Sequence, residues 1–203
     1  MIAPVEKLLP IRLLAMDVDG VLTDGSLTWA HGTGGEPSLE LKRFDARDGL
    51  GIAVAGCIGL EVAWVTGRRS TIVERRAREL GVRELHQGAR SKGRVLKSLL
   101  ERRGLEPAAV AYIGDDLNDL PAFPVVGLRI AVADAAPELA AAADWVTGRP
   151  GGAGAVREVI EGLLRAQERW DAAVNAYLAR LEEEQSAQAE PNGRPPGPLP
   201  PIQ

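Results

Sequence analysis

The stretch Ile11-Arg-Leu-Leu-Ala-Met-Asp17-Val-Asp19-Gly-Val-Leu-Thr23 decides the fold of this 203-residue chain. Residues 11–16 form a short apolar run, which is typical of a strand buried inside a parallel sheet. Asp17 and Asp19 follow it directly. Ligands of open parallel α/β sheets bind beyond the carboxyl ends of the strands. The stretch therefore predicts a buried strand with a polar site at its end.

Similar apolar runs recur downstream, at Val62–Val65, Val110–Ile113 and Leu128–Val132. Segments with helical periodicity separate them. One helix is expected from Thr71, where Thr71 and Glu74 form a capping-box pattern, to Leu80, and another from Ser91 to Gly104. This alternation predicts an α/β fold, a Rossmann-like three-layer α/β/α sandwich around a parallel central sheet, as a single domain over residues 1–184.

Three segments extend this plan. The strand-like runs Ser26–Ala30 and Ser38–Phe44 flank a glycine-rich turn and predict a β-hairpin flap within residues 23–44. No gap between the strand-end motifs can hold a further cap domain, so we expect a capless protein. An apolar stripe predicts one long helix from Ala155 to about Glu183. Residues 185–203 contain six of the fourteen prolines and are predicted to be a disordered tail.

Composition excludes several classes of function. The formal net charge of −4 argues against a nucleic-acid binder. No apolar run approaches the roughly 20 residues that span a bilayer, and residues 1–11 do not read as a signal peptide. We therefore expect a soluble, cytoplasmic protein without nucleic-acid or membrane partners. The single cysteine, Cys57, is expected to be a buried structural thiol. His31 and His86 lack partners at metal or triad spacing and are expected to be structural or solvated.

Polar residues follow each predicted strand. Asp17 and Asp19 follow the first, Thr66 the second, and Asp115 the third, while Lys92 opens the intervening helix. Carboxylates that converge either acquire raised pKa values or recruit a cation. Oxygen-only ligands favour Mg²⁺. An ionised aspartate can also attack phosphorus to form an aspartyl-phosphate, with Lys92 and the Thr66 hydroxyl holding the phosphoryl oxygens.

On these motifs the chain resembles the haloacid dehalogenase superfamily, and within it the 3-deoxy-D-manno-octulosonate 8-phosphate (Kdo 8-phosphate) phosphatases. Further matches are Phe44-Asp-Ala-Arg47-Asp48-Gly49, Val65-Thr-Gly-Arg68, Ala111–Leu117, Val132–Ala135 and Gly151–Glu158. The resemblance implies a magnesium-dependent phosphomonoesterase acting on a sugar-acid phosphate. It implies that Asp17 is the nucleophile and that Asp19 is the general acid and then the base. It also implies that Mg²⁺ is held by Asp17, the Asp19 carbonyl and Asp115.

The resemblance extends to the substrate pocket. The residues expected there are Asp45, Arg47, Asp48, Gly49, Gly67, Arg68, Arg76 and Asn118. A guanidinium at Arg68 suits a substrate carboxylate, unless it pairs locally with Glu61 or an acid of the hairpin. Two positions depart from the family pattern, because Asp45 stands where asparagine is common and Ala153 where a basic residue is common. Arg149 is the candidate to supply that missing charge.

The resemblance implies a homotetramer, in which a neighbouring subunit supplies the wall that a cap domain would otherwise provide. The predicted interface is the flap, with Leu27, Trp29, Leu39 and Leu41. The alternative is that these side chains pack on their own domain. Three other functions stay open: a phosphatase for a nine-carbon keto-sugar acid phosphate, a catalytically idle oligomerisation domain, and a phosphomutase. The intact acidic set argues against the second, and the absent cap against the third.

Overall fold

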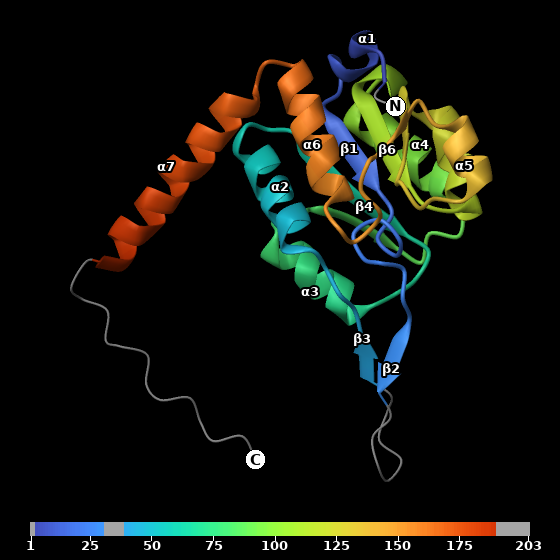
Figure 1. The fold of residues 1–203 in the computed structure, drawn as a ribbon, viewed down its shortest axis with the longest axis horizontal. Coiled ribbons are helices and arrows are strands. Elements are labelled where there is room, and N and C mark those ends of the chain that lie inside the picture. The colour runs from blue at the N-terminus through green and yellow to red at the C-terminus, as the bar shows by residue number, and fades with distance from the viewer. Residues whose placement is uncertain (1–2, 31–38, 190–203) are drawn as a thin grey trace.

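The computed structural model describes residues 3–30 and 39–189, and its central element is a six-stranded sheet (Figure 1). The strands are β1 (Leu13–Met16), β4 (Glu61–Thr66), β5 (Glu84–Gln87), β6 (Val110–Gly114), β7 (Leu128–Ala131) and β8 (Trp145–Val146). They lie in the order β5-β4-β1-β6-β7-β8, and every pairing is parallel. Strand β1, which Asp17 directly follows, is therefore central, with β4 and β6 as its neighbours.

Successive side chains of a strand point to opposite faces of the sheet, and the two faces are covered by different helices. Leu14 and Met16 belong to a core with α2 (Ala46–Cys57), α3 (Thr71–Glu79) and α6 (Ala155–Ala166). Leu13 and Ala15 belong to a second core with α4 (Lys92–Arg103), the 3₁₀ segment η2 (Leu117–Val125) and α5 (Pro137–Ala142). The predicted three-layer α/β/α sandwich is confirmed.

Two short elements complete the body, α1 (Val5–Leu8) and η1 (Pro107–Ala109). The predicted helix ends are close to the observed ones. Gly104 ends α4 with a φ of 58°, in the left-handed region that favours glycine. The cap of α3 is Ser70, not Thr71, because the Ser70 hydroxyl accepts the Val73 N–H at 3.5 Å.

The expectation of one long helix from residue 155 to 183 is wrong. The chain forms α6 and then α7 (Trp170–Ala189), separated at residues 167–169. Glu168 adopts a φ of 56°, and the N–H groups of Glu168 and Arg169 bond the carbonyls of Arg165 and Leu164, which is a Schellman ending. No glycine or proline marks this break in the sequence.

Long-range contacts fix the break. The Gln167 amide donates to the carbonyl oxygens of Leu8, Leu9 and Ile11, and the Arg169 guanidinium donates to the Ile58 carbonyl. These acceptors lie far from residue 167 in the sequence, so helical periodicity carries no information about them. The stripe of apolar residues continues through the break, which explains why one helix was expected.

Helix α7 extends away from the body (Figure 1). Residues 185–189 belong to this helix, although they were expected to start the tail. The first proline beyond them is Pro191, and the residue before a proline disfavours helix, so a helix can continue to about this point. The rest of the predicted tail, residues 190–203, lies outside the described residues. Among the helices that the structure describes, none is long and apolar enough to cross a membrane.

The predicted flap is present. Strands β2 (Thr28–Ala30) and β3 (Leu39–Leu41) pair antiparallel, and an isolated bridge between Thr23 and Phe44 closes the base. The connection, with His31, lies outside the described residues. The flap protrudes from the body (Figure 1), and its apolar side chains are about half exposed, which contradicts the alternative that they pack on their own domain. These side chains are Leu27, Trp29, Leu39 and Leu41.

Cys57 and His86 each make a local contact. The Cys57 thiol is half-buried rather than fully buried, and it donates to the Ala53 carbonyl within α2 at 3.3 Å. The His86 ring lies 3.1 Å from a carboxylate oxygen of Glu84 on the edge strand β5.

Candidate active site

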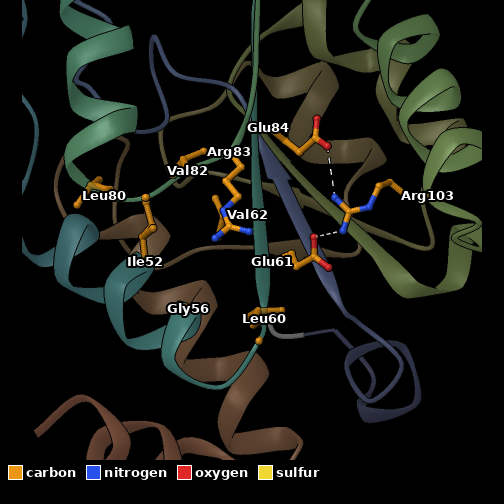
Figure 2. Close-up of a pocket in the computed structure, with 12 residues that line it drawn as sticks. Ile52, Gly56, Leu60, Glu61, Val62, Leu80, Val82, Arg83, Glu84 and Arg103 are labelled. Carbon is orange, nitrogen blue, oxygen red and sulfur yellow. Dashed lines mark hydrogen bonds and ion pairs between the residues drawn. The ribbon is translucent and has the colours of Figure 1, made fainter. Parts of the chain in front are cut away.

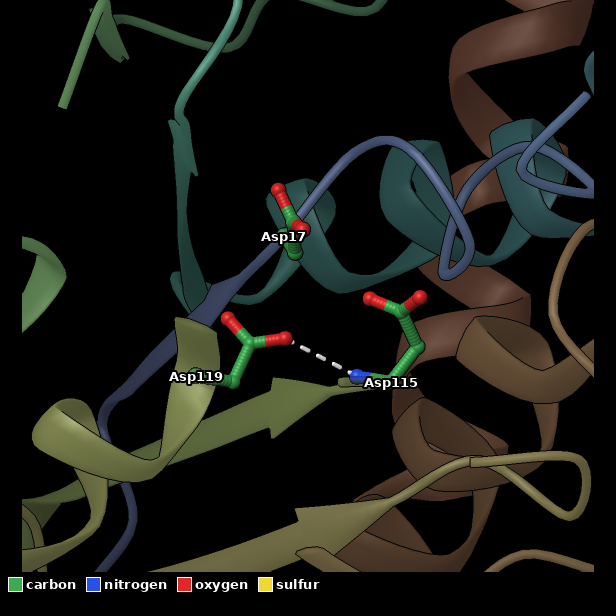
Figure 3. Close-up of side chains that lie close together, drawn as sticks. All are labelled: Asp17, Asp115 and Asp119. Carbon is green, nitrogen blue, oxygen red and sulfur yellow. Dashed lines mark hydrogen bonds between the residues drawn. The ribbon is translucent and has the colours of Figure 1, made fainter. Parts of the chain in front are cut away.

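Three adjacent strands end at one edge of the sheet and deliver the predicted polar residues there. Asp17 directly follows β1, Thr66 ends β4, and Asp115 directly follows β6. Asp17 and Thr66 are buried. Figure 3 shows the carboxyl groups of Asp17, Asp115 and Asp119 converging, and one oxygen from each lies within 4.8 Å of the others. The predicted convergence at the carboxyl edge is therefore observed.

The ammonium of Lys92 neutralises part of the negative charge of these carboxylates. It is the first residue of α4, and its ammonium lies 2.6 Å from an Asp17 oxygen and 2.5 Å from an Asp119 oxygen. Its side chain is 2% exposed. The other Asp17 oxygen accepts the Val18 N–H at 2.7 Å. Asp17 is therefore held at both oxygens, with the lysine on the side of the sheet that α4 covers.

Asp119 was quoted within the third motif but received no predicted role. It is fully buried, and both of its oxygens are occupied. One accepts from Lys92 and from the Tyr112 hydroxyl at 2.6 Å, and the other accepts the N–H groups of Asp115 and Asp116 at 2.9 and 3.4 Å. Asp119 thus positions the lysine and the loop after β6. The sequence signal was an acidic residue four positions after Asp115, inside the largely apolar segment η2.

The acidic cluster has strongly shifted pKa values. Burial raises the pKa of Asp17 to about 6, with Lys92 opposing the rise and Asp119 adding to it. Burial, together with the charges of Asp17 and Asp119, raises the pKa of Asp115 to about 8. Burial lowers the pKa of Lys92, but the two carboxylates outweigh it and raise that pKa above its usual value. If all three carboxylates were ionised, the single ammonium would leave two negative charges uncompensated.

A divalent cation fits this charge and this geometry. The Oδ1 atom of Asp115 is buried without a hydrogen-bond partner. A Cβ on Gly20, whose φ is 95°, would lie 2.0 Å from the other Asp115 oxygen, so the backbone after Asp19 lies against this carboxylate. Both Asp119 oxygens are already used. The unpartnered Asp115 oxygen, close to the buried carboxylate of Asp17, suits Mg²⁺, and the ligand set of Asp17, Asp115 and the Asp19 carbonyl stays a prediction.

The Asp19 side chain lies in a second cluster, where the flap meets the body. One of its oxygens contacts the Lys42 ammonium, and the other lies 3.7 Å from the Arg68 Nε. Arg68 also approaches a Glu40 oxygen at 3.5 Å, whereas Glu61 pairs with Arg103. Of the two local partners considered for Arg68, the hairpin acid is the one observed. Neither Lys42 nor Glu40 was predicted, because both lie in a strand-like run read only for its apolar residues.

Three predicted substrate residues lie at the start of α2, against the glycine loop 151–154. Asp45 caps α2 and pairs with the Arg47 guanidinium at 2.7 Å, which also donates to the Ala153 carbonyl at 2.8 Å. The buried Asp48 accepts the Gly154 and Arg157 N–H groups at 3.2 and 2.7 Å. A Cβ on Gly151 would lie 1.7 Å from the Gly20 carbonyl oxygen, so this loop packs directly on the loop that follows Asp19.

The remaining predicted residues border this region. Arg149 comes close to Gly154, because a Cβ there would lie 3.1 Å from its guanidinium. Within the described part of the chain this guanidinium has no hydrogen bond or ion pair. Arg76 lies against Gly49, where a Cβ would be 2.3 Å from its guanidinium. Gly67 and Asn118 are exposed.

A groove of about 400 Å³ lies at the opposite end of β4 (Figure 2). It is lined by the ends of α2 and α3 and by the first residues of β4 and β5, with Arg103 between Glu61 and Glu84. Residue 61 begins β4 and residue 66 ends it, so this groove is remote from the acidic cluster. None of the predicted site residues lines it. The candidate site is therefore the carboxyl edge.

The chain is similar to known proteins over most of its length. Residues 59–160 match the family of haloacid dehalogenase-like hydrolases. The chain is 50% identical over 163 residues to 3-deoxy-D-manno-octulosonate 8-phosphate phosphatase KdsC of Escherichia coli strain K12, which covers 80% of this chain and 84% of that protein.

Solved structures give the same result. The Yersinia pestis 3-deoxy-D-manno-octulosonate 8-phosphate phosphatase shares 45% identity with a TM-score of 0.76, covering 82% of this chain and 88% of that one. The Moraxella catarrhalis enzyme of the same name was solved in complex with magnesium, phosphate and Kdo. It shares 40% identity with a TM-score of 0.78, covering 85% of this chain and 97% of that one.

Magnesium should stabilise this protein more at pH 8 than at pH 6. The pKa of Asp115 is raised from 3.8 to about 8, so between these values the metal-free folded state binds more protons than the unfolded state, and stability falls as pH rises. Mg²⁺ needs the ionised carboxylate. At about a hundred times its Kd it should raise the Tm by roughly 5 to 10 °C at pH 8, and by less at pH 6. Thermal unfolding in EDTA and in Mg²⁺ measures both shifts.

The variant Asp115→Asn is the control for this effect. It removes one repelling charge, so at pH 8 in EDTA it should be more stable than the wild type, and it should lose most of the response to Mg²⁺. An equal Mg²⁺ shift at both pH values, or an undiminished shift in Asp115→Asn, would contradict the assignment of Asp115 as a metal ligand.

Proposed function

The chain belongs to the family of haloacid dehalogenase-like hydrolases, and we propose that it is a magnesium-dependent phosphatase that hydrolyses Kdo 8-phosphate to Kdo and inorganic phosphate. The observation that carries this proposal is the buried carboxylate of Asp17, held between Lys92 and the Val18 N–H beside the unpartnered oxygen of Asp115. A nucleophile, a cation for phosphoryl oxygens and a metal site thus meet at one point. The phosphatases that the chain resembles support the choice of substrate.

The reaction follows from the roles of two aspartates. Asp17 attacks phosphorus, the bond from phosphorus to the sugar oxygen breaks, and that oxygen takes a proton from Asp19. Water then attacks the phosphorus of the aspartyl-phosphate, Asp19 takes the proton, and the bond to Asp17 breaks to release phosphate. Lys92 and the Thr66 hydroxyl hold phosphoryl oxygens throughout. Bound Mg²⁺ supplies charge neutralisation for the phosphoryl group and for the carboxylates of Asp17 and Asp115.

The sugar-acid part of the substrate needs cations near the leaving-group side. Arg68 lies 3.7 Å from the side chain of Asp19, so its guanidinium is within the site. Arg47 and Arg149 lie at the glycine loop that packs on Gly20, and Arg149 is placed to replace the basic residue missing at Ala153. Cations at these places suit a carboxylate, and they select a keto-sugar acid over a neutral sugar. The preference for an eight-carbon over a nine-carbon keto-sugar acid phosphate is supported only by the names of the similar proteins.

We further propose that the protein is a homotetramer in which neighbouring subunits cover one another's sites. The flap presents four large apolar side chains that are 46–62% exposed, namely Leu27, Trp29, Leu39 and Leu41. An apolar patch of this kind on a protruding hairpin is typical of a protein interface. Lys42, which directly follows β3, contacts Asp19. An interface at the flap would therefore lie close to the catalytic residues.

Asp17→Asn should abolish turnover, because an amide is a poor nucleophile and the substitution removes one charge from the metal site. The expected loss in kcat is more than a hundredfold, or about 2.7 kcal/mol of barrier. Phosphate release from Kdo 8-phosphate, measured with and without Mg²⁺, checks it. A smaller loss would remove Asp17 as the nucleophile. A wild-type protein without turnover would favour the idle oligomerisation domain instead.

Arg68→Ala should weaken hydrolysis of Kdo 8-phosphate selectively. Loss of a desolvated carboxylate contact costs about 2 kcal/mol or more, so kcat/KM should fall roughly thirtyfold. Glycerol phosphate has a similar alkoxide leaving group but no carboxylate, and its hydrolysis should be almost unchanged. Because Arg68 also contacts Glu40 and Asp19, a structural role would lower both activities together. Equal losses would therefore end the proposed carboxylate contact.

Leu39→Asp should shift the protein towards smaller assemblies, because a charge placed in an apolar interface is unfavourable. Light scattering at micromolar concentration should give about four chain masses for the wild type and fewer for this variant. Leu178→Asp is the matched control, since Leu178 is also about half exposed but lies on α7. A wild-type monomer, or equal dissociation in both variants, would argue against the flap as the interface.

A further inference from the structure

Strand β3 and the residues after it send their apolar and charged side chains in different directions. Leu39 and Leu41 are exposed. The side chains of Glu40 and Lys42 turn to the body instead, and they are 15% and 1% exposed. The next residue, Arg43, is 73% exposed and pairs with Asp24. A lysine buried on a protruding hairpin is unusual, because long charged side chains at such places normally reach water.

The burial of Lys42 is explained by its partners. Its ammonium contacts one oxygen of Asp19 and approaches an oxygen of Glu40 at 3.5 Å. A buried ammonium is strongly destabilising unless such carboxylates surround it. The ion pair of Lys42 and Asp19 therefore forms only when the flap is seated against the loop that follows β1. The flap and the proposed acid of the reaction are thus tied through a single side chain.

Glu40 in turn is fixed to the body of the protein. Its second carboxylate oxygen accepts the Ser70 hydroxyl at 2.7 Å, and the Ser70 N–H donates to the Gln87 side chain at 2.7 Å. Ser70 is the cap of α3 and is itself buried. Glu40 therefore connects Lys42 to α3 and to the edge strand β5, which makes Lys42 a rigid partner for Asp19.

The two oxygens of Asp19 are left in different states. Oδ1 is occupied by Lys42, whereas Oδ2 is buried and makes no hydrogen bond in the described part of the chain, with Arg68 Nε as its nearest cation at 3.7 Å. A general acid and base needs one oxygen free to carry a proton and a fixed orientation of the carboxyl plane. The contact with Lys42 supplies the orientation and leaves Oδ2 for the proton.

We propose that Lys42 is a positioning residue of the reaction, which holds Oδ1 of Asp19 so that Oδ2 exchanges the proton with the leaving oxygen and with water. This inference rests on the proposed phosphatase activity. Lys42 does not touch the reacting atoms and acts through Asp19 alone. Its effect is therefore confined to steps in which Asp19 handles a proton.

The experiment measures kcat/KM in Mg²⁺ for glycerol phosphate and p-nitrophenyl phosphate, in the wild type, Lys42→Met, Asp19→Asn and the double variant. The leaving group departs within the steps that kcat/KM reports. Glycerol leaves as an alkoxide that needs a proton, whereas nitrophenolate does not. Lys42→Met should lower kcat/KM more than tenfold for glycerol phosphate and less than threefold for p-nitrophenyl phosphate. In the Asp19→Asn background, Lys42→Met should have almost no further effect, because the two residues act as a unit.

Two further variants separate positioning from folding. Lys42→Arg keeps the charge and should recover most of the activity on glycerol phosphate. Arg43→Met is the matched control at the neighbouring, exposed position and should behave as the wild type on both substrates. Three results would each overturn the proposal. The losses of kcat/KM could multiply in the double variant, or Lys42→Met could lower kcat/KM equally for both substrates. Lys42→Arg could also fail to restore the activity although its Tm is unchanged. Failure of the proposed function is distinct, because the wild type would then release no phosphate from Kdo 8-phosphate.

Discussion

The constraint on which the site depends is the concentration of like charge at the end of β1. Asp17, Asp115 and Asp119 converge around one ammonium, that of Lys92. Such a group is stable only if the chain surrounds it with fixed partners. The order of the strands provides them. With β1 between β4 and β6, the hydroxyl of Thr66 and the loop after Gly114 reach the same edge, and α4 begins there with its lysine. A Cβ at Gly114 would lie 2.5 Å from Asp119, so the close approach of that loop requires glycine.

The parts of this arrangement that follow from local pattern could be predicted from the sequence. Short apolar runs followed by aspartate or threonine indicate buried parallel strands with polar ends, and the rule that such ends meet places Asp17, Thr66 and Asp115 together. The parts that depend on contacts distant in sequence could not. The break at Glu168 is held by carbonyls of Ile11, just before β1, and of Ile58, just after α2. The contacts of Asp119 are visible only when Lys92 and Tyr112 are placed beside it.

The flap shows a second feature that the sequence could not predict, namely which side of a hairpin faces the body. A hairpin could be expected from alternation and glycine content, and attention then falls on its apolar residues because they are unusual at a surface. The residues that contact the body are the alternate, charged ones. Glu40 and Lys42 look like solvated side chains in the sequence, because charged residues in short strands usually are. Only the paired positions of Asp19, Ser70 and Arg68 show that they face the body. Sequence position alone does not tell which face of a two-stranded hairpin is covered.

The cluster around Asp19 and the cluster around Asp17 also differ in their balance of charge. In the outer cluster, Asp19 and Glu40 are balanced by Lys42 and Arg68, so it is neutral and can form from the chain alone. The inner cluster has two negative charges in excess when its three carboxylates are ionised, and a divalent cation would balance them. Burial, together with the repulsion between these carboxylates, raises the pKa values of Asp17 and Asp115. The contacts of Asp19 with Lys42 and Arg68 are made by the chain itself. Under the proposed function, the metal acts on the nucleophile and the phosphoryl group, whereas these contacts orient the Asp19 side chain. In a capless chain the flap would then orient the proposed acid without a domain that closes over each substrate.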